Sequence, residues 1–180
     1  SGRCVLSNLF TNRDANRGGC SQICRWDFLL KDEDKNKIEG KMPFTFCSKD
    51  LSMLRHIPEM IDMGISSFKI EGRMRSSYYI ATVVSIYRKV IDEYLENKET
   101  YVYKQEYEDD LFRCANRDSV PQFFDNNYDH TCSYYNGRVE TSNKDFLGVV
   151  LDGDLGDGYI KLEQRNYFEK GDLVEFLSPG

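Results

Sequence analysis

Apolar side chains recur at helical spacing in one long stretch of the chain, residues 76–95. The positions every three or four residues along it are Tyr79, Val83, Ile86, Tyr87, Val90 and Tyr94. This spacing places their side chains on one face of an α-helix. We therefore predict a long amphipathic helix over residues 76–95, with that face buried.

Shorter apolar runs precede this helix. Residues 44–47 and 65–70 have the length and composition of short strands. Between them, Ser48 is suited to cap a helix, and Pro58 to begin a second one. The order strand, helix, strand, helix predicts parallel pairing. This part of the chain therefore has the pattern of the tail end of an α/β sheet or barrel, which does not close by itself.

The pattern changes after an acidic linker near residues 96–110. Short β-type runs separated by turn signals follow, at residues 111–116, 131–139, 146–151, 159–162 and 173–177. These predict an all-β meander or small antiparallel barrel. We expect three segments: residues 1–100 as α/β, with a cysteine-rich loop at 1–27, residues 101–110 as linker, and residues 111–180 as the β module.

Length and charge limit the classes of protein. The 180 residues are fewer than the roughly 250 of a complete TIM barrel. The net charge of -6 argues against a uniformly basic surface that coats nucleic acid, although residues 1–27 carry more cations than carboxylates. No apolar stretch approaches the roughly 18 residues of a membrane span, so we expect no membrane partner. The six cysteines are too sparse for a disulfide scaffold and have no secretory context, so we expect a cytoplasmic location.

Four of the six cysteines lie near the front of the chain, at Cys4, Cys20, Cys24 and Cys47. Thiolates at the first three positions suit zinc or an iron–sulfur cluster, because soft sulfur stabilises both. Buried or free thiols without a metal are the alternative interpretation. A cysteine nucleophile is weakly supported, because the only imidazoles are His56 and His130 and the sequence places neither near this front cluster.

A second candidate site follows the predicted strand at residues 65–70. Lys69, Glu71 and Arg73 lie between this strand and the long helix, which is the edge of a parallel sheet where α/β folds place ligand sites. The guanidinium of Arg73 suits bidentate binding of a carboxylate or phosphate, and Glu71 could orient it or accept a proton. A structural ion pair is an equally good interpretation.

Three further residues have plain interpretations. Core packing is favoured for Trp26 over stacking on a nucleobase. Cys114 and Cys132, within predicted strands, are interpreted as buried thiols.

Four ordered motifs resemble peptidase family U32, also called the collagenase-like proteases. The motifs occupy residues 1–7, 13–26, 48–51 and 68–74, and further similarity extends over nearly the whole chain. The resemblance implies that residues 1–100 are the last portion of a TIM-barrel-like parallel α/β domain. It also implies that residues 111–180 are the small antiparallel β-barrel domain of the family.

The resemblance also implies a chemistry. Family members that hydroxylate RNA or the ubiquinone ring use cysteine-bound 4Fe-4S clusters, and Cys4, Cys20 and Cys24 match cysteines of that type. Relatives often have Asn before the Ser48–Leu51 motif and Cys after it, whereas this chain has Cys47 before and Ser52 after. The resemblance leaves three alternatives for the fourth ligand: Cys47, a cysteine that the family signature places seven residues before Cys4, or no fourth cysteine. Cys47 is therefore the least certain ligand.

Three classes of function remain. The resemblance favours an enzyme that binds tRNA and forms 5-hydroxyuridine with prephenate as co-substrate. A peptidase acting on a peptide substrate is the second class, although residues 1–180 show no Ser-His-Asp or His-Glu-x-x-His pattern. A non-catalytic scaffold is the third.

Overall fold

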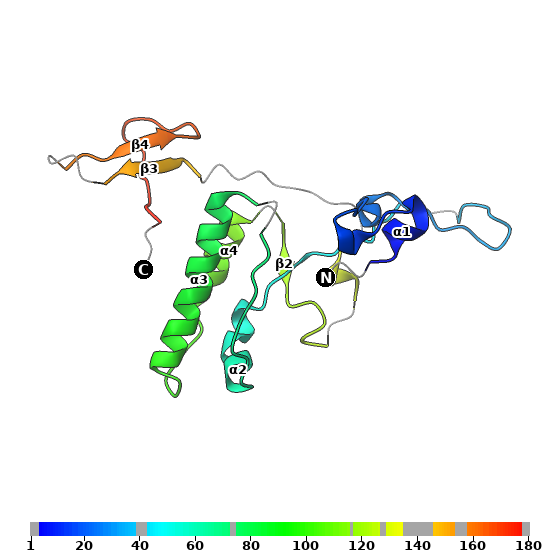
Figure 1. The fold of residues 1–180 in the computed structure, drawn as a ribbon, viewed down its shortest axis with the longest axis horizontal. Coiled ribbons are helices and arrows are strands. Elements are labelled where there is room, and N and C mark those ends of the chain that lie inside the picture. The colour runs from blue at the N-terminus through cyan, green and yellow to red at the C-terminus, as the bar shows by residue number, and fades with distance from the viewer. Residues whose placement is uncertain are drawn as a thin grey trace. The chain divides into compact units, whose positions relative to one another are not determined.

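The structure is a computed structural model that describes residues 4–38, 43–72, 75–115, 117–126, 129–134, 146–153 and 158–177. The chain divides into two compact units (Figure 1). Unit 1 comprises Ser1–Ser52 and Ser119–Glu140, and unit 2 comprises Met53–Asp118 and Thr141–Gly180. The helical part of unit 2 is therefore inserted, in sequence, between the two segments of unit 1.

Unit 1 contains short elements. Its helical turns are α1 (Leu6–Thr11), η1 (Ala15–Arg17), η2 (Ile23–Arg25) and η4 (His130–Cys132), and its strands are β1 (Asp50–Leu51) and β2 (Ser119–Val120). The strands pair in parallel, with Asp50 opposite Ser119. The cysteine-rich segment predicted as a loop is therefore partly helical. Its turns are sharp because Asn12 and Gln22 adopt left-handed backbone conformations, with φ of 54° and 56°.

Residues 44–47 form an extended segment with two different faces. Thr45 and Cys47 are buried, whereas the side chain of Phe46 is 52% exposed. Phe44 makes a single antiparallel bridge with Phe28 rather than a strand. The rings of Phe28, Phe44 and Phe46 contact one another at 4.9–6.1 Å between centroids. The strand predicted at residues 44–47 is wrong, because only one bridge forms there.

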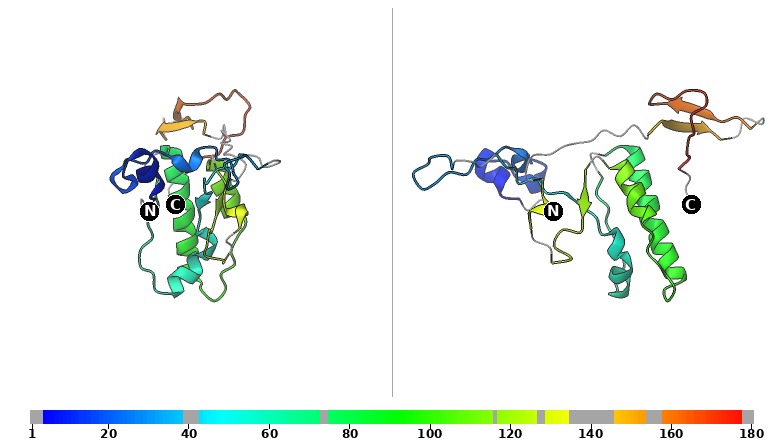
Figure 2. Two further views of the ribbon diagram at one scale, coloured as in Figure 1. Left: turned by 90° about the vertical axis from the view of Figure 1, so that its right-hand side faces the viewer. Right: turned by 180° about the vertical axis from the view of Figure 1, so that it is seen from behind.

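The helical part of unit 2 is built on one long helix. Its elements are η3 (Leu54–His56), α2 (Ile57–Asp62), α3 (Ser77–Glu96) and α4 (Glu106–Cys114). The Ser76 side chain accepts a hydrogen bond from the Tyr79 amide at 3.2 Å and so caps α3. Figures 1 and 2 show α4 running beside α3. The helix predicted over residues 76–95 is confirmed.

The core of unit 2 lies where these helices meet. Its buried members are Leu54, Ile57, Val83, Ile86, Val90, Tyr107, Leu111 and Cys114. Val83, Ile86 and Val90 belong to the face of α3 predicted from the spacing, as does the buried Tyr94. Of the two helices predicted from Ser48 and Pro58, the second exists, as α2, with Pro58 in its first turn. The first is wrong, because Asp50 and Leu51 form β1.

The strand predicted at residues 111–116 is wrong, because these residues lie mostly in α4. Glu106, Glu108 and Asp109 occupy the first turn, where carboxylates favour the positive end of a helix. Tyr107, Leu111 and Cys114 then fall on one buried face at spacings of four and three. The acidic residues interpreted as linker thus begin a helix.

No strand forms over residues 65–70 or 173–177 of the described chain. The described part of the C-terminal module contains one antiparallel pair, β3 (Gly148–Asp152) with β4 (Lys161–Gln164). Gly148 is required there, because a Cβ atom would lie 2.5 Å from the Glu163 carbonyl oxygen. Closed barrels in either domain stay predictions.

Candidate metal centre

All four front cysteines belong to unit 1. Cys4 and Cys20 are exposed, Cys24 is half-buried, and Cys47 is buried. None of the four is in a disulfide. Cys20 precedes η2 and Cys24 lies within η2, so one short segment of the chain carries both thiols.

The electrostatics of Cys24 show that the other three thiols lie in its neighbourhood. Burial raises the pKa of the Cys24 thiol, and negative charge on Cys47, Cys20 and Cys4 raises this pKa further. Arg25 acts in the opposite direction. The pKa of Cys24 thus depends on the charge state of the other three thiols.

The sulfur of Cys20 accepts two hydrogen bonds. The Gln22 amide donates at 3.4 Å, and the Ser7 hydroxyl donates at 3.9 Å. The Ser7 hydroxyl in turn accepts a hydrogen bond from the Ser21 amide at 3.0 Å. Sequence reasoning missed Ser7, because a serine in a short helix carries no signal of a thiol partner 13 residues away.

By their chemistry, the four thiols of unit 1 are donors suited to zinc or to an iron–sulfur cluster. Among the described residues, however, no group of three or more His, Cys, Asp or Glu side chains is arranged as a ligand sphere. The donor chemistry therefore fits a soft metal centre, and the ligand set Cys4, Cys20, Cys24 and Cys47 stays a prediction.

The second predicted site is described only in part. The Lys69 ammonium lies 3.4 Å from a Glu71 carboxylate oxygen, and both side chains are exposed. Arg73 lies outside the described residues. Nothing described decides between an anion site and a structural ion pair at this position.

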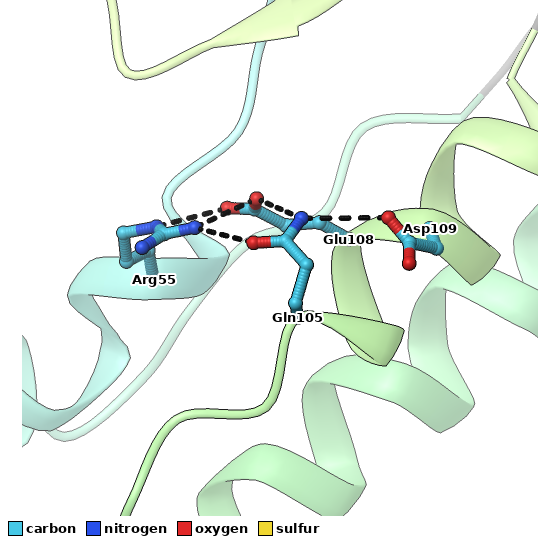
Figure 3. A network of polar contacts seen from close by, with 4 residues as sticks. All are labelled: Arg55, Gln105, Glu108 and Asp109. Carbon is cyan, nitrogen blue, oxygen red and sulfur yellow. Dashed lines mark hydrogen bonds and ion pairs between the residues drawn. The ribbon is translucent and has the colours of Figure 1, made fainter.

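Figure 3 shows a polar network in the scaffold of unit 2. Arg55 of η3 donates to both carboxylate oxygens of Glu108 on α4, at 3.1 and 2.8 Å, and to the Gln105 side-chain carbonyl at 3.0 Å (Figure 3). The Gln105 amide extends the network to Glu108 and Asp109. The hydrogen bond from Arg55 lowers the pKa of Glu108. This network joins two elements of the unit 2 core.

The remaining residues singled out in the sequence have clear positions. Cys114 and Cys132 are buried as predicted, although both lie in helical turns rather than in strands. Trp26 is 48% exposed, so the prediction of core packing is wrong. No described helix is long and apolar enough to cross a membrane.

The chain belongs to peptidase family U32. Residues 1–133 match this family, and residues 142–180 match its C-terminal domain. These two matches confirm the resemblance carried by the four motifs.

Curated relatives include both RNA-modifying enzymes and a protease. The chain is 47% identical over 184 residues to tRNA hydroxylation protein P1 of Bacillus subtilis, covering 99% of this chain and 44% of the relative. It is 26% identical over 225 residues to tRNA hydroxylation protein P of Escherichia coli, covering 99% of the chain and 49% of the relative. A collagenase of Porphyromonas gingivalis is 40% identical over 95 residues, covering 52% of the chain and 23% of the relative.

The chain thus spans about half the length of the two tRNA hydroxylation proteins. No solved structure matches it.

Proposed function

We propose that this chain is part of an RNA-modifying enzyme that hydroxylates uridine in tRNA to 5-hydroxyuridine. The observation that carries the proposal is the 47% identity to tRNA hydroxylation protein P1, which extends over 99% of the chain. The match to the collagenase covers only 52% of the chain.

The proposal includes a 4Fe-4S cluster held by Cys4, Cys20 and Cys24, with Cys47 as the candidate fourth ligand. Two observations support it: the three other thiols all act on Cys24, and Cys20 accepts two hydrogen bonds. Such a cluster supplies electron transfer when bound. Cys47 is 3% exposed, so of the four proposed ligands it is the one most protected from water.

We further propose that Arg73 binds an anionic group of the substrate or of prephenate, with Lys69 and Glu71 adding charge and orientation. Prephenate carries carboxylates, which match the planar fork of a guanidinium. Arg73→Lys keeps the charge and loses the fork, so we expect the KM for prephenate to rise about tenfold or more. Unchanged kinetics with lower thermal stability would instead favour a structural ion pair.

The peptidase alternative has less support in this part of the chain. It requires an activated nucleophile or a metal-bound water. The two histidines belong to different units, and His56 lies 3.4 Å from Glu59 on the same short segment.

The test uses the intact protein, purified without oxygen. We expect iron and sulfide in the wild type, and 5-hydroxyuridine in tRNA from cells that express it, measured by nucleoside mass spectrometry. The Cys4, Cys20 and Cys24 triple change to Ser should remove both signals. Cys114→Ser is the matched control, because Cys114 is a buried thiol of unit 2 and its change should remove neither.

An iron-free wild type that cleaves gelatin, with the triple variant equally active, would contradict the proposal and favour the peptidase.

A further inference from the structure

The Cys20 sulfur is held by a small hydrogen-bonded cluster that begins on α1. Ser7 is 1% exposed, and its hydroxyl has a donor side and an acceptor side. The acceptor side takes the Ser21 amide at 3.0 Å, and the donor side faces the Cys20 sulfur at 3.9 Å. A buried hydroxyl needs both kinds of partner, so the sulfur is the acceptor that satisfies Ser7.

A second set of contacts in the cluster bypasses the sulfur. The Thr11 hydroxyl donates to the Ser7 carbonyl oxygen at 2.6 Å and lies 2.7 Å from the Ser21 hydroxyl. Thr11 therefore joins the same two segments as Ser7 does, but it has no hydrogen bond to Cys20. Both residues hold this loop to α1, but only Ser7 donates a hydrogen bond to the sulfur. Changes at Ser7 and Thr11 can therefore distinguish the two effects.

We propose that Ser7 is a positioning residue for Cys20, whose hydroxyl, with the Gln22 amide, orients the sulfur and stabilises it as a ligand of the metal centre. The inference rests on the proposed iron–sulfur function. Hydrogen bonds to a ligand sulfur draw electron density from it, which favours the reduced cluster and slows ligand loss.

The test compares the intact protein with three variants after anaerobic loading with iron and sulfide. Ser7→Ala removes the donor to sulfur, Ser7→Thr keeps a hydroxyl, and Thr11→Val removes a tether alone. Circular dichroism checks that each variant is folded. The readouts are the reduction potential of the cluster and the rate at which an iron chelator removes the metal.

We expect Ser7→Ala to have a more negative potential and to lose iron about 10–100-fold faster than the wild type. Ser7→Thr should restore both values toward the wild type. Thr11→Val should keep the wild-type potential and rate, even if its melting temperature falls.

The proposal is overturned if Ser7→Ala keeps the wild-type potential and rate, or if Thr11→Val shifts both as far as Ser7→Ala does. If Ser7→Ala does not fold, Ser7→Thr decides: a folded Ser7→Thr with the potential and rate expected for Ser7→Ala contradicts the proposal, and wild-type values support it. A wild type that binds no iron overturns this proposal and the proposed cofactor together. The Ser7 inference can therefore fail by itself only if the wild type binds iron.

Discussion

At the scale of single residues, the thiols differ in their exposure to solvent. Cys4 and Cys20 are exposed, whereas Cys114 is 4% exposed within the unit 2 core. Burial raises the pKa of the Cys114 thiol to about 11. Since the thiolate is the nucleophile, only about 0.1% of Cys114 is reactive at pH 8, before the steric protection of the core is counted.

We therefore expect iodoacetamide to label Cys4 and Cys20 of the metal-free protein well before Cys114, by at least about 100-fold at pH 8. The rate at Cys114 should rise about tenfold for each pH unit as long as the fold persists. Peptide mass spectrometry after timed quenching measures each site. Labelling of Cys114 as fast as Cys20 would contradict the burial described here.

Single residues were predictable when their role depended on the chain nearby. Ser76 and the apolar face of α3 follow from local spacing. Trp26 was not predictable, because a large aromatic is usually buried and nothing in the neighbouring sequence indicates that its ring is 48% exposed. The donor role of Ser7 depends on a turn that brings Cys20 back to α1, so it also required coordinates.

At the scale of elements, the hydrogen bonds of Arg55 connect η3 to α4. The Arg55 guanidinium meets both oxygens of Glu108, and it also lies 4.8 Å from the ring centre of Tyr103. Lysine has no planar fork and stacks less well on a ring. The Arg55 side chain is 53% exposed, so solvent screening keeps the contribution small.

We expect Arg55→Lys to lower the free energy of unfolding by about 0.5–1 kcal/mol in urea denaturation at pH 7. Arg88→Lys is the matched control, because the Arg88 pair with Asp92 lies within α3 and joins no elements. Its effect should stay below about 0.5 kcal/mol. Equal losses in the two variants would indicate that the Arg55 contact does not tie η3 to α4.

Elements were predictable where one pattern extended over several turns, as in α3. α4 was missed because its acidic first turn resembles a linker and its apolar end resembles a strand when each is considered alone. The pairing of β1 with β2 was also beyond sequence reasoning, since two residues in each strand carry no periodicity. The closed barrels expected from the family stay predictions.

At the scale of the molecule, several carboxylates couple stability to pH. Hydrogen bonds from Tyr94, Tyr107 and Arg55 lower the pKa values of Asp62, Glu93 and Glu108 respectively. A carboxylate with a lowered pKa in the folded state stabilises the fold above its unfolded pKa. This contribution disappears as the pH falls through the folded value.

We predict that the free energy of unfolding is nearly constant between about pH 5 and pH 8 and falls steadily below about pH 4.5. Glu108→Gln should be less stable than the wild type at pH 7, and the difference should shrink as the pH approaches 3. Urea denaturation at half-unit pH steps measures both curves. Parallel curves from pH 7 to 3 would show that Glu108 carries none of this dependence.

Unit 1 is completed by contacts between its two distant segments. The Thr45 hydroxyl donates to the Tyr134 carbonyl oxygen across 89 residues. At roughly 5–20 residues per second, a ribosome needs about 4–18 s to synthesise that interval. Throughout this time the nascent segment around Cys47 has not met its partner, although Cys4, Cys20 and Cys24 have already been made. During biosynthesis, therefore, the hydrogen bonds of Thr45 and of the Cys47 carbonyl oxygen to Tyr134 can form only after this interval.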